Sequence, residues 1–392
     1  MRMGSPGLAA APSMAVAAVP FAGVKAGEWD DNANYREFGK WLGTEQGQAF
    51  HRVDVRDRQF IVVRDVDGKA VPRCPVTVTD PQSQRSVTLT TTSNGRAILF
   101  PHAEGLAGDE LSATAHCQNA TVAARFSARQ SDGVVDLKLG AKRALAPTVD
   151  VDIAFFLDTT GSMSEEITAV KATIQKVAGA LGTSNARVRV GLVEYKDRTD
   201  AFVTKLYPMT TDVRRFSQDV ASIEASGGGD TPEDACAGLH AGLTGLDWSG
   251  NAVVKLAFLI GDAPPHLDYA NGTAYEADMR DAAHRGIQVY TVAASGMDDL
   301  GQVVWRQIAQ YTGATNLFVL RGGAGPQSTG GGDPKSSCGG TQGNYASGNL
   351  DALILQKVKR AVGALERDPL QIAGLRVDED AKPCAARLKI AE

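Results

Sequence analysis

Oxygen-bearing side chains gather at three points of this sequence. The first follows the apolar run VDIAFFL, the second follows the glycines of SGGGDTPEDA, and the third follows the apolar run LAFLI. Carboxylates and hydroxyls without histidine or cysteine suit a hard divalent cation. We predict that one such cation binds here, most readily Mg²⁺, with Mn²⁺ or Ca²⁺ as alternatives. The candidate ligands are Asp158, Thr160, Ser162, Asp230, Thr231 and Asp262.

Strand-like and helix-like segments alternate from residue 148 to residue 366. Continuous apolar runs such as VDIAFFL are typical of parallel strands that are covered on both faces. We therefore predict an α/β fold with a Rossmann-like, doubly wound and mostly parallel sheet. Ligands of such sheets bind at the carboxyl ends of the strands, which is where this prediction places all three points.

Small residues and a proline accompany these side chains. We expect Gly161 to let the chain turn tightly after Thr160, and the glycines at 227–229 to let the backbone approach the site, since glycine tolerates positive φ. Pro232 suits the first turn of a helix that Asp230 or the next residue would cap.

The three points together resemble a known family. DTTGSMS resembles the D-x-[ST]-x-S motif of the metal-ion-dependent adhesion site in von Willebrand factor type A domains, and GGGDTPED and LIGDAPPH resemble the second and third loops of that family. The resemblance covers residues 148–366. It implies that Asp158, Thr160 and Ser162 are metal ligands, directly or through water, and that Asp262 is the third-loop carboxylate.

The sequence departs from the family pattern in two places. Thr160 stands where many relatives have serine, and it keeps the hydroxyl. Asp230 aligns with the threonine of the second loop, and Thr231 follows it. If Asp230 coordinates, three carboxylates hold the cation tightly and leave it less attractive to an acidic partner. If Asp230 caps a helix, Thr231 is the ligand. We favour Asp230 and leave the alternative open.

The resemblance implies a binding protein and not an enzyme. In this family the cation keeps one open position, which a carboxylate of a partner protein fills, so we expect a role in adhesion or assembly. The alternative is a phosphotransferase similar to haloacid dehalogenases, with Asp158 as nucleophile and Lys255 neutralising charge. That match is poorer, because Thr160 and His266 stand where acidic residues are expected.

Three further expectations concern the surroundings of these loops. We expect His266 to pack within its own loop, Asp197 and Arg198 to form a solvated turn, and Cys236 to be buried on a helix.

Residues 53–143 predict an all-β module. Alternating apolar and polar residues flank Asp-Gly and Asn-Gly turns. This stretch resembles the carboxypeptidase-regulatory-like or Cna-B-like β-sandwich modules of bacterial surface proteins, which implies a spacer or a binding module. Cys74 and Cys117 lie within it, and the sequence leaves open whether they form a disulfide or are two unrelated thiols.

The other segments are assigned by composition. Residues 1–23 read as a leader or a degenerate signal peptide, and residues 24–52 as an aromatic-rich segment that packs on a domain. Residues 321–348 read as a glycine-rich loop, and 367–392 as a C-terminal tail.

Charge and hydropathy argue against a nucleic-acid partner and against a membrane-spanning segment. The net charge is −5 and basic residues form no stripe, which argues against nucleic acid. No stretch has the roughly 20 apolar residues of a membrane span. We expect a secreted, periplasmic or cell-surface protein, with a cytoplasmic one as the alternative.

Overall fold

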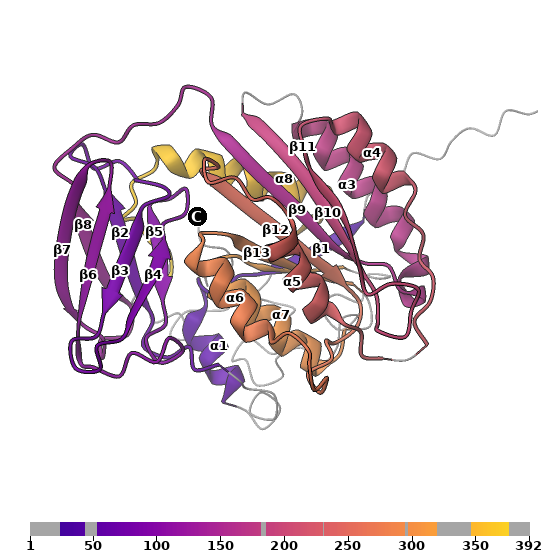
Figure 1. Cartoon of the computed structure of the whole chain (residues 1–392), viewed down its shortest axis with the longest axis horizontal. Coiled ribbons are helices and arrows are strands. Elements are labelled where there is room, and N and C mark those ends of the chain that lie inside the picture. The colour runs from indigo at the N-terminus through magenta and orange to yellow at the C-terminus, as the bar shows by residue number, and fades with distance from the viewer. Residues whose placement is uncertain are drawn as a thin grey trace, which may run out of the picture.

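A computed structural model describes most of the chain. The described residues are 24–43, 53–181, 186–229, 231–294, 297–319 and 346–375. They form an α/β domain that lies beside a β-rich region of lower sequence number (Figure 1). The expected leader lies outside the described residues, as do most of the glycine-rich stretch and the end of the expected tail.

The α/β domain is built on an eight-stranded sheet with the order β11-β10-β9-β12-β13-β14-β1-β15. The five strands from β10 to β14 in this order run parallel, and β11 and β1 pair antiparallel with their neighbours. The strands are β1 (Lys25–Trp29), β9 (Asp150–Asp158), β10 (Arg187–Tyr195), β11 (Thr204–Thr210), β12 (Val254–Gly261), β13 (Gln288–Ala293), β14 (Asn316–Val319) and β15 (Ala346–Asn349).

Helices cover both faces of this sheet. On β9, Phe155 points to one face, where α3, α4 and α8 pack, and Phe156 points to the other, where α1, α5, α6 and α7 pack. Burial on both faces explains the unbroken apolar run, and the predicted doubly wound α/β fold is confirmed. The helices are α1 (Tyr35–Leu42), α3 (Ile167–Leu181), α4 (Val213–Ala221), α5 (Ala235–Gly245), α6 (Tyr275–His284), α7 (Asp299–Tyr311) and α8 (Leu350–Gly363), with 3₁₀ turns η1 (Gly161–Glu165) and η4 (Ala364–Glu366).

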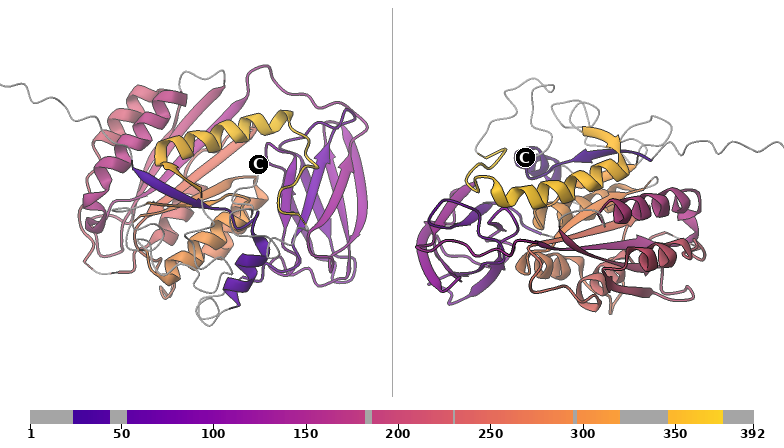
Figure 2. Two further views of the ribbon diagram at one scale, coloured as in Figure 1. Left: turned by 180° about the vertical axis from the view of Figure 1, so that it is seen from behind. Right: turned by 90° about the horizontal axis from the view of Figure 1, so that it is seen from above.

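The N-terminal strand β1 completes the sheet from a distant part of the sequence. It lies between β14 and β15 and pairs with both (Figure 2). Glu28 on this strand is fully buried and forms an ion pair with Lys357 of α8. The sequence did not predict this strand, because KAGEW is short and carries little apolar periodicity. β15 also corrects the glycine-rich loop expected over 321–348, since residues 346–349 form a strand.

The aromatic residues of the N-terminal segment surround one arginine. The guanidinium carbon of Arg306 on α7 lies 4.0 Å from the ring centre of Trp41, and 5.0 and 5.2 Å from those of Trp29 and Phe38. Its guanidinium donates two hydrogen bonds to Asp31, at 2.9 and 2.6 Å. The expected packing role of these aromatics is therefore correct, and its centre is a buried cation.

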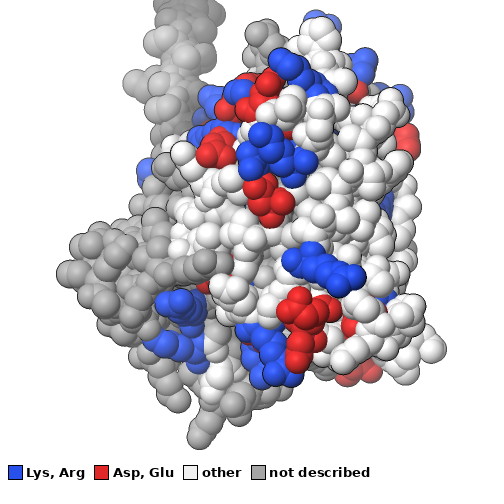
Figure 3. All heavy atoms as spheres, turned by 90° about the vertical axis from the view of Figure 1, so that its left-hand side faces the viewer, with Lys and Arg blue, Asp and Glu red and all other residues white. Residues whose placement is uncertain are grey.

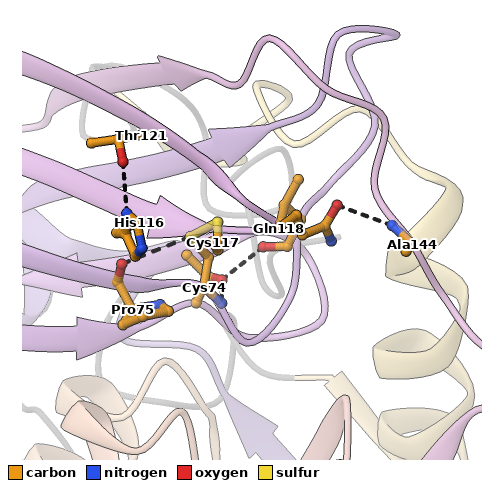
Figure 4. Close-up of a disulfide and its surroundings, with 9 residues drawn as sticks. Cys74, Pro75, His116, Cys117, Gln118, Thr121 and Ala144 are labelled. Atoms are coloured by element: carbon orange, nitrogen blue, oxygen red, sulfur yellow. Dashed lines mark hydrogen bonds between the residues drawn. A yellow bond between two sulfur atoms is a disulfide. The ribbon is translucent and has the colours of Figure 1, made fainter.

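The β-rich region consists of two sheets, β5-β2-β8 and β4-β3-β6-β7, which share one apolar core. Its strands are β2 (Gln59–Arg64), β3 (Pro75–Thr79), β4 (Ser86–Thr90), β5 (Arg96–Leu99), β6 (Glu110–Cys117), β7 (Ala120–Ser127) and β8 (Gly133–Lys138). Cys74 and Cys117 form a disulfide, which resolves the alternative left open by the sequence (Figure 4). Next to it, Gln118 accepts a hydrogen bond of 3.0 Å from the backbone N–H of Ala144.

The β-rich region is held against the α/β domain by polar contacts at both ends of the junction. Arg143 and Lys69 form ion pairs with Glu366, which lies in η4 after α8. At the other end, Glu104 accepts hydrogen bonds from His284 of α6 and from Tyr311 of α7.

The outward face of the β-rich region carries charges of both signs. Lysine and arginine lie beside aspartate and glutamate on this face and form no patch of one sign (Figure 3). Among the described residues, no helix is long and apolar enough to cross a membrane.

We predict that Arg306→Ala lowers the free energy of unfolding by about 3–5 kcal/mol, because it leaves the Asp31 carboxylate buried without its partner. Chemical denaturation measures this loss. The exposed Arg214→Ala on α4 is the control, with an expected change within about 0.5 kcal/mol. Equal effects of the two variants would contradict the structural role of Arg306.

Candidate metal site at the strand ends

The register of the sheet brings the predicted loops to one edge. Asp158 ends β9, where it pairs with Tyr195 at the end of β10. β12 runs parallel on the other side of β9 and ends at Gly261, directly before Asp262. The first and third loops therefore leave the sheet side by side.

A chain of hydrogen bonds connects four of the predicted residues. Oδ1 of Asp158 accepts hydrogen bonds from the backbone N–H and the hydroxyl of Thr160, at 2.9 and 2.7 Å. The Thr160 and Ser162 hydroxyls are 3.1 Å apart, and Ser162 donates to Oδ1 of Asp262 at 2.9 Å. Asp158 and Thr160 are fully buried, whereas Ser162 is exposed.

The structure does not decide between the two candidates of the second loop. Asp230 lies outside the described residues. Thr231 is described and exposed, and it takes no part in the hydrogen-bond chain between the first and third loops.

A glutamate that we did not predict lies at this site. Glu233 is 2% exposed, and its carboxyl interacts with the hydroxyl of Thr160. Its backbone joins the second loop to the third, because its N–H donates to the Pro264 carbonyl and its own carbonyl accepts from the N–H of His266, both at 3.0 Å. The available signal was its place directly after Pro232, which we interpreted as a helix start.

Burial and mutual repulsion make these carboxyls hard to ionise. Burial, and next the charge of Asp262, raise the pKa of Asp158 to about 7. Burial, and next the charge of Asp158, raise the pKa of Glu233 to about 8. Burial also raises the pKa of Asp262. Among the described residues, Oδ2 of Asp158 and Oε2 of Glu233 are buried without a hydrogen-bond partner.

Lys196 lies beneath the site and joins two of its loops. Its ammonium group donates to the carbonyl oxygens of Thr159 and Ser226, and it is 3% exposed. Its charge lowers the pKa of Asp158, but this effect is weaker than those of burial, of the charge of Asp262 and of the hydrogen bonds from Thr160. Asp200 holds the glycine run by accepting a hydrogen bond of 2.8 Å from the N–H of Gly228.

The glycines allow close approach between loops. Gly227 and Gly228 have φ of +74° and +65°, as expected. Gly161 begins the 3₁₀ turn η1 directly after Thr160, as expected, and it also allows a close contact between two loops. Its N–H donates to the carbonyl of Gly227, and a Cβ on Gly161 would lie 2.6 Å from that oxygen.

The start of α5 also corrects the prediction. The helix begins at Ala235, and Asp234 caps it by accepting a hydrogen bond of 3.0 Å from the N–H of Ala237. Pro232 therefore lies in the loop before the helix and not in the first helical turn.

The turn at Asp197 and Arg198 is solvated only in part, because Arg198 is exposed as expected and Asp197 is buried. Asp197 is 1% exposed and accepts a hydrogen bond of 2.6 Å from the hydroxyl of Tyr269. Arg198 lies over the ring of Tyr269 and forms an ion pair with Asp234. His266 stacks on the same ring, in agreement with its predicted packing role.

Two further residues are placed clearly. Cys236 is buried as predicted, and burial raises the pKa of its thiol to about 12. Lys255 lies near the start of β12, about 20 Å along the strand from the end where Asp262 follows. The phosphotransferase alternative therefore lacks the lysine that was assigned to it.

The donors present at the strand ends fit a hard cation. They are carboxylate and hydroxyl oxygens, and two of them, Oδ2 of Asp158 and Oε2 of Glu233, are buried without a hydrogen-bond partner among the described residues. In the part of the chain that the structure describes, no group of three or more His, Cys, Asp and Glu side chains is arranged to hold a metal ion. Coordination here would consequently depend on the hydroxyl ligands.

Comparison with protein families identifies the α/β domain. Residues 152–298 match the family model of the von Willebrand factor A domain. The chain therefore contains a von Willebrand factor A domain, with a mixed central sheet flanked by helices and an additional β-rich N-terminal region. Domains of this class generally serve in protein interaction, which supports such a role for this chain.

Two curated proteins match part of the chain. A putative ariadne-like RING finger protein of Acanthamoeba polyphaga mimivirus is 29% identical over 169 residues, 43% of this chain. The alpha-protein kinase vwkA of Dictyostelium discoideum is 30% identical over 145 residues, 36% of this chain. The matches span only 15% and 22% of the length of these relatives.

Solved structures overlap loosely with this one. The pilus adhesin SpaC from Lactobacillus rhamnosus GG, in its open conformation, has a TM-score of 0.38 and 12% identity, over 65% of this chain and 32% of its own. BatB from Bacteroides thetaiotaomicron has a TM-score of 0.36 and 14% identity, over 55% of this chain and 99% of its own. Proximal thread matrix protein 1 from the mussel byssus has a TM-score of 0.31 and 13% identity, over 39% of this chain and 38% of its own.

We predict that Gly161→Ala lowers the free energy of unfolding by about 1–3 kcal/mol, because its Cβ would push the first loop away from Gly227. Gly229→Ala is the matched control, since a Cβ there would meet no atom within 4 Å. Urea denaturation of both variants measures the difference. A loss from Gly229→Ala as large as that from Gly161→Ala would contradict this packing argument.

Proposed function

We propose that the von Willebrand factor A domain binds a partner protein through a divalent cation, Mg²⁺ in preference to Mn²⁺ or Ca²⁺, and that a carboxylate of the partner completes the coordination. In this proposal the chain acts by recognition and not by catalysis. The residues that would hold the cation are Asp158, Thr160, Ser162 and Asp262, with Asp230 or Thr231 from the second loop and with Glu233 as an addition.

The observation that carries this proposal is the environment of Asp158. Its Oδ2 is buried without a hydrogen-bond partner among the described residues, and Asp262 and Glu233 repel its charge. A buried carboxylate whose charge is only partly neutralised is costly for a folded protein. A cation among these oxygens would turn the repulsion into attraction and would keep all three groups ionised.

Some residues of the site would bind the cation, and others would leave it accessible to a partner. Asp158 and Asp262 supply negative charge, and the neutral hydroxyls of Thr160 and Ser162 add oxygen ligands without further charge. A bound cation would supply positive charge for an incoming carboxylate. Ser162 and Thr231 are exposed, so the partner has access from the side where these two residues lie.

We further propose a secreted, periplasmic or cell-surface location, with the cytoplasm as the alternative. The Cys74–Cys117 disulfide supports the first of these, because disulfides persist mainly in oxidising compartments. Adhesion or assembly outside the cell would then be the setting of the interaction.

We predict that calorimetric titration of metal-free protein with Mg²⁺, Mn²⁺ and Ca²⁺ shows saturable binding to one site. Asp158→Asn should weaken that binding at least about a hundredfold, because it removes a charged ligand from a buried site. Glu224→Gln is the control, since Glu224 is exposed and lies outside the site. Failure of the unaltered protein to bind any of the three ions would contradict the proposal.

The open position has its own test. With Mn²⁺ bound, the relaxation rate of water protons should rise, and it should fall again when a glutamate-containing peptide is added, because the peptide carboxylate displaces bound water. The same peptide with glutamine in place of glutamate is the control. An equal effect of both peptides would contradict recognition of a carboxylate.

A further inference from the structure

A cavity of about 420 Å³ lies between the β-rich region and the α/β domain, away from the strand ends described above. Its floor includes Gln288 and Tyr290 of β13 and residues 312–315, which precede β14. These residues lie at or near the amino ends of the strands, whereas Asp158 lies at the carboxyl end of β9. The size falls within the roughly 300–1,000 Å³ that is typical of small-molecule sites.

Four parts of the chain that are distant in sequence form the walls of the cavity. Phe60 and residues 92–94 come from the β-rich region, Arg360 from α8, Asp30 from the segment after β1, and residues 367–373 from the chain after η4. α8 runs toward the β-rich region in both views of Figure 2. A molecule in the cavity would therefore contact both domains at once.

The cationic side chains that line the cavity differ in whether other residues of the protein bind them. Lys357 forms an ion pair with Glu28, and Arg96 donates to the carbonyls of Pro369 and Gln371 at 2.6 Å. By contrast, Nη1 of Arg360 is buried and has no hydrogen-bond partner among the described residues.

The guanidinium of Arg360 lines the cavity, forms no ion pair with a described residue, and has one buried nitrogen, Nη1, without a hydrogen-bond partner. Leaving a buried donor unsatisfied is costly, and the costs are larger for a charged group than for a neutral one. The planar guanidinium matches the geometry of a carboxylate or a phosphate and can bind either through two parallel hydrogen bonds. Arg360 is therefore the half-buried lining residue that is best suited to bind an anion, and the exposed Arg367 lies in the same lining.

We propose that this cavity binds a small organic anion whose carboxylate or phosphate group pairs with Arg360. The body of the ligand lies against Phe60, Ile98 and Tyr290, which give the cavity its apolar surface. The polar side chains of residues 92–94 and Gln288 supply hydrogen bonds to hydroxyl groups of the ligand. The site is independent of the proposed metal site, and its occupation stabilises the junction between the two domains.

Calorimetric titration of the full chain at constant ionic strength tests this inference. The probes are succinate and glycerol phosphate, each paired with its bare group as acetate or inorganic phosphate. We expect one organic anion to bind more tightly than its bare counterpart and to raise the melting temperature. Preference for succinate would assign a carboxylate ligand, and preference for glycerol phosphate would assign a phosphate ligand.

The variant Arg360→Gln should weaken the preferred probe at least about tenfold, because it removes a charge-assisted hydrogen bond. Lys359→Gln is the matched control, since it removes an exposed charge from the next position of α8 and should leave the affinity unchanged. Far-ultraviolet circular dichroism checks that both variants fold. The proposal is overturned if neither organic probe binds, if the bare groups bind as tightly, or if the two variants behave alike.

Discussion

The burial of the Asp158 carboxylate is the constraint on which the strand-end loops depend. The sheet places this group at the tip of a central strand, where water is excluded and where Asp262 and Glu233 add negative charge. The surrounding loops are arranged to tolerate it through hydroxyl donors and through the ammonium group of Lys196. These contacts offset only part of the cost, because one carboxylate oxygen stays without a donor among the described residues. That remaining imbalance supports the proposed binding of a cation.

The N-terminal segment and the β-rich region are integral to the domain that carries the site. β1 lies inside the sheet, and the pairs Glu28–Lys357 and Asp31–Arg306 tie it to α8 and α7. The β-rich region packs at the end of the α/β domain opposite to the strand-end loops. Glu104 and the ion pairs of Glu366 hold it there. The two ends of the α/β domain thus have separate tasks: polar loops face outward at one, and the second domain packs against the other.

Periodicity and local motifs predicted the features that depend on residues close together in the sequence. The doubly wound sheet, the position of the first and third loops, the burial of Cys236 and the packing of the N-terminal aromatics follow from apolar runs and spacing. Pairing between strands that are distant in the sequence could not be predicted from these patterns, as the insertion of β1 beside β14 shows. Glu233 was missed for a related reason, because only the tertiary contact with Thr160 distinguishes it from a glutamate at a helix start.

The most direct test of the cation at Asp158 is crystallographic. Crystals of the full chain soaked in Mn²⁺ should show one strong peak in an anomalous difference map, within coordination distance of the oxygens of Asp158, Ser162 and Asp262. The peak would also show whether Asp230 or Thr231 is the second-loop ligand. A fully occupied Mn²⁺ peak elsewhere, with water or no density beside Asp158, would contradict the metal site at the strand ends.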